Sequence, residues 1–111
     1  MLFQSKKKKK YAWLADADIA LDNVEEGLKM LASHIRIIDE IVSSEPANRH
    51  WQEQQMRSYA GYAMRLAEHE EMVASGKYVE LATTLAKELE AHDPTNEEWS
   101  KWLKSLSKMQ H

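Results

Sequence analysis

An apolar stripe with heptad spacing constrains the fold of this chain more than any other feature. Apolar residues follow one another at steps of three and four without a break: Leu14, Ala17, Leu21, Val24, Leu28, Leu31, Ile35, Ile38 and Val42. This spacing over about four heptads places one apolar face along an α-helix and is typical of a coiled-coil seam. At ~1.5 Å per residue the helix would be roughly 43 Å long. It has to bury its stripe against other helices or against a second copy of the chain.

The composition favours an all-α fold. Three Gly and two Pro in 111 residues are few for a β-rich fold, which needs many turns. Ala, Leu, Glu, Lys, Met and Gln are abundant, and all of them favour helix. A length of 111 residues is typical of one domain, and a hydrophobic content of 43% is enough for one core. We therefore expect a single helical domain over residues 11–111, preceded by a basic tail over residues 1–10.

Two prolines and a glycine divide the chain into four expected helices. Pro46 interrupts the first long helix, because the residue before a proline avoids helical angles. Gly76 is the expected left-handed cap of the second helix, and Asp93-Pro94 separates the last two. We expect helices over about residues 11–42, 46–74, 77–92 and 96–109. The first two predict an antiparallel hairpin of long helices, with two shorter helices packed on it as in a four-helix bundle.

Some side chains next to the predicted apolar stripes carry chemistry of their own. His34 adjoins the first stripe, and we expect it to be partly buried and hydrogen-bonded. Glu70 interrupts the stripe of the second helix and is expected to face His34, Arg36 or a basic group of a partner. Small residues over 60–67 predict the tightest helix crossing there.

The sequence lacks the residue types and motifs on which several functions depend. The absence of Cys excludes disulfides, thiolate nucleophiles and Cys-ligated metals, and it fits a cytoplasmic location. The sequence has no run of about 18 apolar residues, so we expect no membrane span. No Glu-x-x-His pair of a di-metal bundle, phosphate-binding loop or nucleophile elbow is present. We expect no catalytic residues, no metal and no cofactor. We expect the acid clusters Asp16, Asp18 and Asp22, and Glu68, Glu70 and Glu71, to be solvated, with Glu70 as the exception because it falls on the predicted stripe.

Four tryptophans suggest a contact surface: Trp13, Trp51, Trp99 and Trp102. Trp is rarely fully buried and, with Tyr and Arg, dominates the energetics of protein interfaces. The alternative interpretation is that Trp99 and Trp102 close one end of a small core. The sequence leaves both interpretations open.

A run of five consecutive lysines gives the chain its charge asymmetry: Lys6, Lys7, Lys8, Lys9 and Lys10. The formal net charge is −3, and without the run ten basic residues remain against eighteen acidic ones. The run lies next to Tyr11 and Trp13, a combination that predicts sequence-independent binding to nucleic acid or weak binding to an anionic membrane. The rest of the chain is acidic and would repel the phosphates of nucleic acid. Nucleic-acid binding is therefore the alternative hypothesis.

The favoured hypothesis is a non-catalytic protein–protein interaction module. A small acidic helical bundle that binds another protein as an adaptor, inhibitor or assembly factor fits the composition and the tryptophans. The two short helices together are hardly long enough to cover the whole apolar stripe of the first helix. We therefore also expect self-association through a coiled coil, most simply as a two-fold homodimer.

Overall fold

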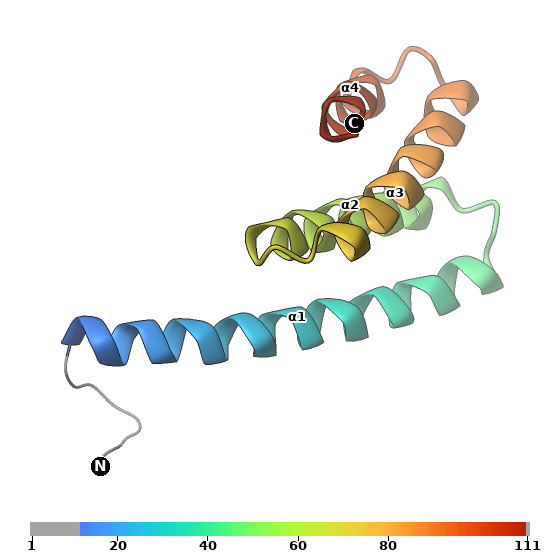
Figure 1. Cartoon of the computed structure of the whole chain (residues 1–111). Helices are drawn as coiled ribbons and strands as arrows, with labels where there is room; N and C mark the ends of the chain where they lie inside the picture. Colours follow the sequence, from blue (N-terminus) through green and yellow to red (C-terminus); the bar gives the residue numbers. More distant parts are fainter. Residues whose placement is uncertain (1–11, 111) are drawn as a thin grey trace. The chain divides into compact units, whose positions relative to one another are not determined.

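Four α-helices make up the part of the chain that the computed structural model describes (Figure 1). The described backbone covers residues 12–110, and the described side chains cover residues 24–110. The chain forms two compact units, Met1–Met30 and Leu31–His111. The predicted all-α fold of packed helices is confirmed, and none of the four helices is long and apolar enough to cross a membrane.

Helix α1 spans Ala12–Ser44 and has 33 residues. Its backbone is helical through the whole heptad stripe, so the predicted long first helix is confirmed. In the unit Leu31–His111 the stripe is buried at Ile35 and Ile38, which are 6% and 2% exposed. Ile37 lies off the stripe and is 57% exposed.

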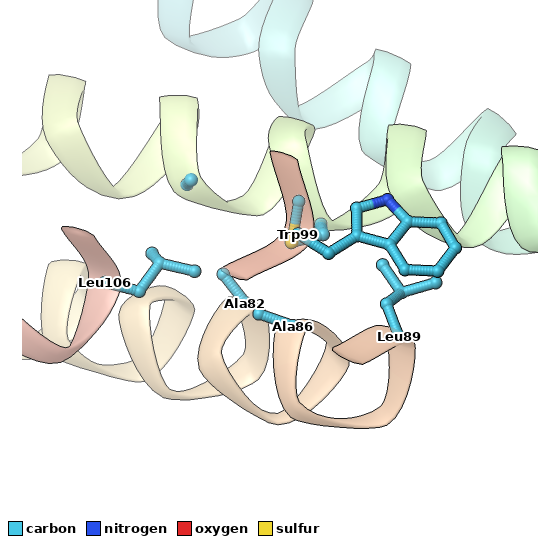
Figure 2. Close-up of a cluster of buried hydrophobic side chains, with 7 residues drawn as sticks. Ala82, Ala86, Leu89, Trp99 and Leu106 are labelled. Carbon is cyan, nitrogen blue, oxygen red and sulfur yellow. The ribbon is translucent and has the colours of Figure 1, made fainter. Parts of the chain in front are cut away.

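Helices α2 (Arg49–Glu68), α3 (Met72–His92) and α4 (Glu97–Met109) build the main core. Helices α2 and α3 pack against each other most extensively, and α4 packs on α3. Figure 2 shows the buried cluster between them, in which Leu89, Trp99 and Leu106 are the larger labelled side chains. Every member comes from these three helices: Met56, Ala60, Ala82, Ala86, Leu89, Trp99 and Leu106.

Small side chains explain the close packing of α2 on α3. Ala60 and Ala63 on α2 are at most 1% exposed, and they lie in the range predicted for the tightest crossing. Ser75 Oγ on α3 donates a hydrogen bond of 2.8 Å to the carbonyl oxygen of Ala63. A side chain of one helix therefore reaches the backbone of the other, which requires a short separation between the two.

The predicted boundary between the second and third helices is wrong. Gly76 lies inside α3 with a negative φ, and α2 ends at Glu68, well before that glycine. Helix α2 ends in a Schellman motif, in which the Glu71 amide donates to the Leu66 carbonyl and the Glu70 amide donates to the Ala67 carbonyl. Glu70 has the left-handed φ of 63° that such a motif requires. It therefore lies in the turn and is exposed, instead of lying on a helical stripe.

Asparagine side chains begin the helices that follow the two proline turns. Asn48 Oδ1 accepts a hydrogen bond from the Trp51 amide, and Asn96 Oδ1 accepts one from the Trp99 amide. The second helix was expected to start at about Pro46 and begins at Arg49, whereas the fourth was expected from about residue 96 and begins at Glu97. Pro46 lies in the turn, and its carbonyl oxygen accepts a 2.9 Å hydrogen bond from the buried Gln52 side chain.

Candidate interaction surfaces

The three tryptophans whose side chains are described do not form one exposed aromatic patch. Trp99 is 7% exposed and belongs to the core cluster, while Trp102 is half-buried and packs against that cluster. Trp51 is half-buried at the start of α2, with its ring 5.5 Å from that of His50. The side chain of Trp13 lies outside the described residues. A partner contact at Trp51 or Trp102 stays a prediction, and Trp99 has a structural role.

Trp99 and Trp102 differ in what surrounds their rings. The Trp99 Nε1 group is buried without a hydrogen-bond partner among the described residues. The Arg57 guanidinium lies 5.6 Å from the Trp102 ring centroid. Arg57 also forms an ion pair of 2.9 Å with Glu53 and a longer one of 3.9 Å with Glu98. The exposed edge of Trp102 is therefore part of a charged surface between α2 and α4.

A hydrogen-bonded group joins the second half of α1 to α2. Tyr59 Oη donates to Asp39 Oδ1 at 2.7 Å, and Gln55 Nε2 donates to the same oxygen at 2.8 Å. Burial, and then the hydrogen bond and negative charge of Asp39, raise the pKa of the Tyr59 hydroxyl well above its ordinary value. The Tyr78 ring lies 5.7 Å from that of Tyr59. This group was not predicted, although Asp39 directly follows the buried stripe residue Ile38 in sequence.

His34 and Glu70 are both exposed, so the expectation that His34 is partly buried is wrong. His34 lies on the solvent side of α1 beside the buried Ile35, because a rotation of one residue is enough to leave the stripe. Glu70 forms no ion pair among the described residues, so a pairing with His34 or Arg36 is not observed.

The first part of α1 carries the heptad stripe beyond the unit Leu31–His111. Within the unit Met1–Met30, the described backbone is one helix, so that unit has no second described helix against which to bury a stripe. Val24 and Leu28, the stripe residues whose side chains are described there, are half-buried, and Met30 beside them is 71% exposed. This end of α1 is the first candidate contact surface.

The turn between α2 and α3 forms a second candidate surface, which combines exposed apolar side chains with acids. Val73 is 92% exposed, Met72 is 58% exposed and Met64 is 49% exposed. Single exposed apolar residues are ordinary, whereas several around one turn are typical of a contact surface. We call this surface the turn patch, and define it by six residues: Met64, Glu68, Glu70, Glu71, Met72 and Val73.

Other parts of the described chain offer little for a small ligand. An open pocket of about 400 Å³ lies between α3 and the end of α4, and it is lined by Gly76, Val79, Glu80, Met109 and Gln110. Glu80 is its one ionisable lining residue. Over residues 24–110, no group of three or more His, Asp or Glu side chains is placed to hold a metal ion.

The lysines of the expected basic tail all lie outside the described residues: Lys6, Lys7, Lys8, Lys9 and Lys10. The structure therefore does not bear on that tail or on its binding to nucleic acid, and both stay predictions. Comparison of the chain with family models, with curated proteins and with solved structures finds no match in any of the three.

Proposed function

We propose that this chain is a non-catalytic protein–protein interaction module that associates through the first part of α1. The observation that carries the proposal is the continuation of the heptad stripe through Val24 and Leu28 into a unit with one described helix. A single amphipathic helix of this kind is marginal in water, since most helix stability in proteins comes from packing an apolar face. A partner helix supplies that packing.

The simplest partner for this stripe is the same stripe of a second copy. A seam of heptad spacing pairs with another seam of the same spacing, and closed two-fold dimers are the commonest oligomers. The dimer in turn would present two copies of the α2–α4 core to a further protein, as an adaptor, inhibitor or assembly factor does. The acidic surface of the body favours a partner protein that carries basic groups.

A charge placed on the stripe tests this proposal. We expect Leu28→Asp to convert a dimer into a monomer in sedimentation equilibrium at low micromolar concentration, because two buried carboxylates would face each other across the seam. Met30→Asp is the matched control, since Met30 lies off the stripe and is 71% exposed, and it should leave the dimer intact. Both variants should keep the thermal unfolding midpoint of the α2–α4 core. A wild-type chain that is a monomer at all concentrations reached would refute the dimer.

A further inference from the structure

We propose that the turn patch binds the basic segment Leu2–Lys10 of a second copy of this chain. This inference rests on the proposed self-association and adds a second contact to it. The patch lies in the unit Leu31–His111, whereas the stripe used above lies in the unit Met1–Met30, so separate variants can address the two surfaces.

The exposed apolar residues of the patch set the first requirement for its occupant. Met72 and Val73 open α3, and Met64 lies one turn before the end of α2. Flexible methionine side chains adapt to apolar groups of different shape, which makes them common at contact surfaces. The occupant should therefore carry apolar side chains, and Leu2 and Phe3 supply them.

Charge sets the second requirement. Glu68, Glu70 and Glu71 are all exposed around the turn, and neither Glu70 nor Glu71 forms an ion pair among the described residues. Arg65 is paired with Glu68 at 3.3 Å. Lys77 is exposed on the next turn of α3, with its Nζ 5.6 Å from the centroid of the neighbouring Tyr78 ring, so this cation offsets part of the negative charge. Exposed acids and exposed apolar side chains at one turn fit a partner segment that combines positive charge with apolar groups.

The segment Leu2–Lys10 has both properties within a few residues. Five consecutive lysines follow Leu2 and Phe3, and the rest of the chain is acidic, so no other stretch of this sequence carries such a dense positive charge. In a two-fold dimer each copy offers one basic segment and one turn patch, so the same contact forms twice and the assembly closes. Neutralisation by the partner's acids also lowers the mutual repulsion of the five lysines.

Cross-linking in mixed dimers tests the contact directly. The chain lacks cysteine, so Val73→Cys provides a single thiol inside the patch. A short thiol-to-amine cross-linker, applied to an equimolar mixture of ¹⁴N- and ¹⁵N-labelled Val73→Cys chains, should link the thiol of one isotope to Lys6–Lys10 of the other. Ser107→Cys on α4 is the matched control for an exposed thiol outside the patch, and it should give no link to the lysine run.

Reversing the charges of the lysine run and of the turn patch provides a second test of the contact. We expect replacement of Lys6–Lys10 by Glu to weaken dimerisation about tenfold at low salt, because three exposed ion pairs each contribute a small factor. Replacement of Glu68, Glu70 and Glu71 by Lys in the same chain should restore most of that loss, and about 0.5 M salt should remove the difference between the variants. Circular dichroism establishes that each variant is folded.

The outcomes separate this inference from the proposed function. Links confined to one isotope, or a dimer whose affinity is insensitive to both reversals, would overturn the second-copy contact and leave the α1 dimer standing. Retardation of RNA or DNA by the intact chain at low salt, lost with the lysines and without any link to the introduced thiol of Val73→Cys, would assign the run to nucleic acid and also overturn it. A wild-type monomer would refute both proposals.

Discussion

Glu70 adopts a φ of 63°, a conformation that glycine reaches without the steric penalty of a side chain. The left-handed conformation places Cβ close to the following carbonyl oxygen and costs about 1–2 kcal/mol for a residue other than glycine. Glu70 occupies the C′ position of a Schellman motif, where glycine is the usual residue. The negative charge of Glu70 in this turn therefore comes with a lower free energy of unfolding than glycine would give at the same position.

We expect Glu70→Gly to raise the free energy of unfolding by about 1 kcal/mol, because the penalty at the left-handed position is removed. Urea denaturation followed by circular dichroism measures the change. Glu68→Gly is the control: it removes a carboxylate from the same turn but lies inside α2, so it should lower stability by up to about 1 kcal/mol. Equal effects of the two variants would mean that charge, and not backbone conformation, decides the result.

Tyr59 should make stability fall in alkaline solution. Its pKa is raised in the folded state, mainly by burial and then by Asp39, so the folded protein holds this proton more tightly than the unfolded chain. The contribution is fully present below the ordinary tyrosine pKa of about 10 and is lost as pH rises above it. We expect the free energy of unfolding to fall between about pH 10 and 11.5, and to fall less steeply in Tyr59→Phe.

Tyr62→Phe is the matched control, because the Tyr62 ring also contacts Tyr78, at 4.8 Å, but its hydroxyl donates no hydrogen bond to Asp39. At pH 7, Tyr59→Phe should destabilise the chain by about 1 kcal/mol, since it removes one hydrogen bond between α1 and α2. An alkaline slope that is the same in wild type and Tyr59→Phe would contradict the assignment.

Residue patterns predict buried positions on α1 better than they predict chemistry. Ile35 and Ile38 are buried where the heptad spacing places them, and Ile37, which lies off the stripe, is exposed. The Asp39–Tyr59 hydrogen bond could not be derived, because it joins side chains 20 residues apart and depends on the register between two helices. Sequence spacing fixes a face of one helix, whereas register is set by packing.

At the scale of the elements, Gly61 and Gly76 lie inside helices without a packing reason for a missing side chain. A Cβ atom built at either residue meets no heavy atom within 4 Å. Glycine in a helix interior lowers the free energy of unfolding by about 0.5–1 kcal/mol relative to alanine, because its backbone loses more conformational freedom on folding.

We expect Gly61→Ala and Gly76→Ala each to raise the free energy of unfolding by about 0.5–1 kcal/mol, measured by thermal or urea denaturation. Ala63→Gly is the opposite control: Ala63 is fully buried on α2, so the change removes a packed methyl group as well as helix propensity and should be destabilising. A loss of stability in Gly61→Ala would reveal a close approach at that helix face that the isolated chain does not contain.

The helix boundaries show what turn chemistry can and cannot predict. Pro46 and Pro94 correctly separate elements, because proline disfavours a helical residue before it. Gly76 misled the prediction, since glycine is tolerated within a helix when other contacts hold the helix together. The true stop at Glu70 carries no sequence signal of its own, because a left-handed glutamate is uncommon.

At the scale of the whole chain, the two units should differ in how their backbone amides exchange with solvent. We expect the amides of Val24–Met30 to exchange more slowly as protein concentration rises through the dimer dissociation constant, because association stabilises this part of α1. Amides of α2 and α3 next to Met56 and Leu89 should show no such dependence, since their core is complete within one chain. Hydrogen exchange measured by mass spectrometry at two concentrations provides the comparison.

Exchange rates in Val24–Met30 that do not change with concentration would count against association through α1. If exchange in the core slowed together with exchange in α1, folding of α2–α4 would instead depend on the dimer.

The all-α class and the long first helix were predictable at this scale from composition and heptad spacing. The division into two units was not, because it depends on which residues pack together in three dimensions.

The buried cluster of α2, α3 and α4 draws none of its described members from α1. We therefore expect substitutions in the part of α1 that precedes Leu31 to leave the α2–α4 cluster folded, so that selection can change this stretch through recognition. Such a chain can acquire new associates while its scaffold stays the same.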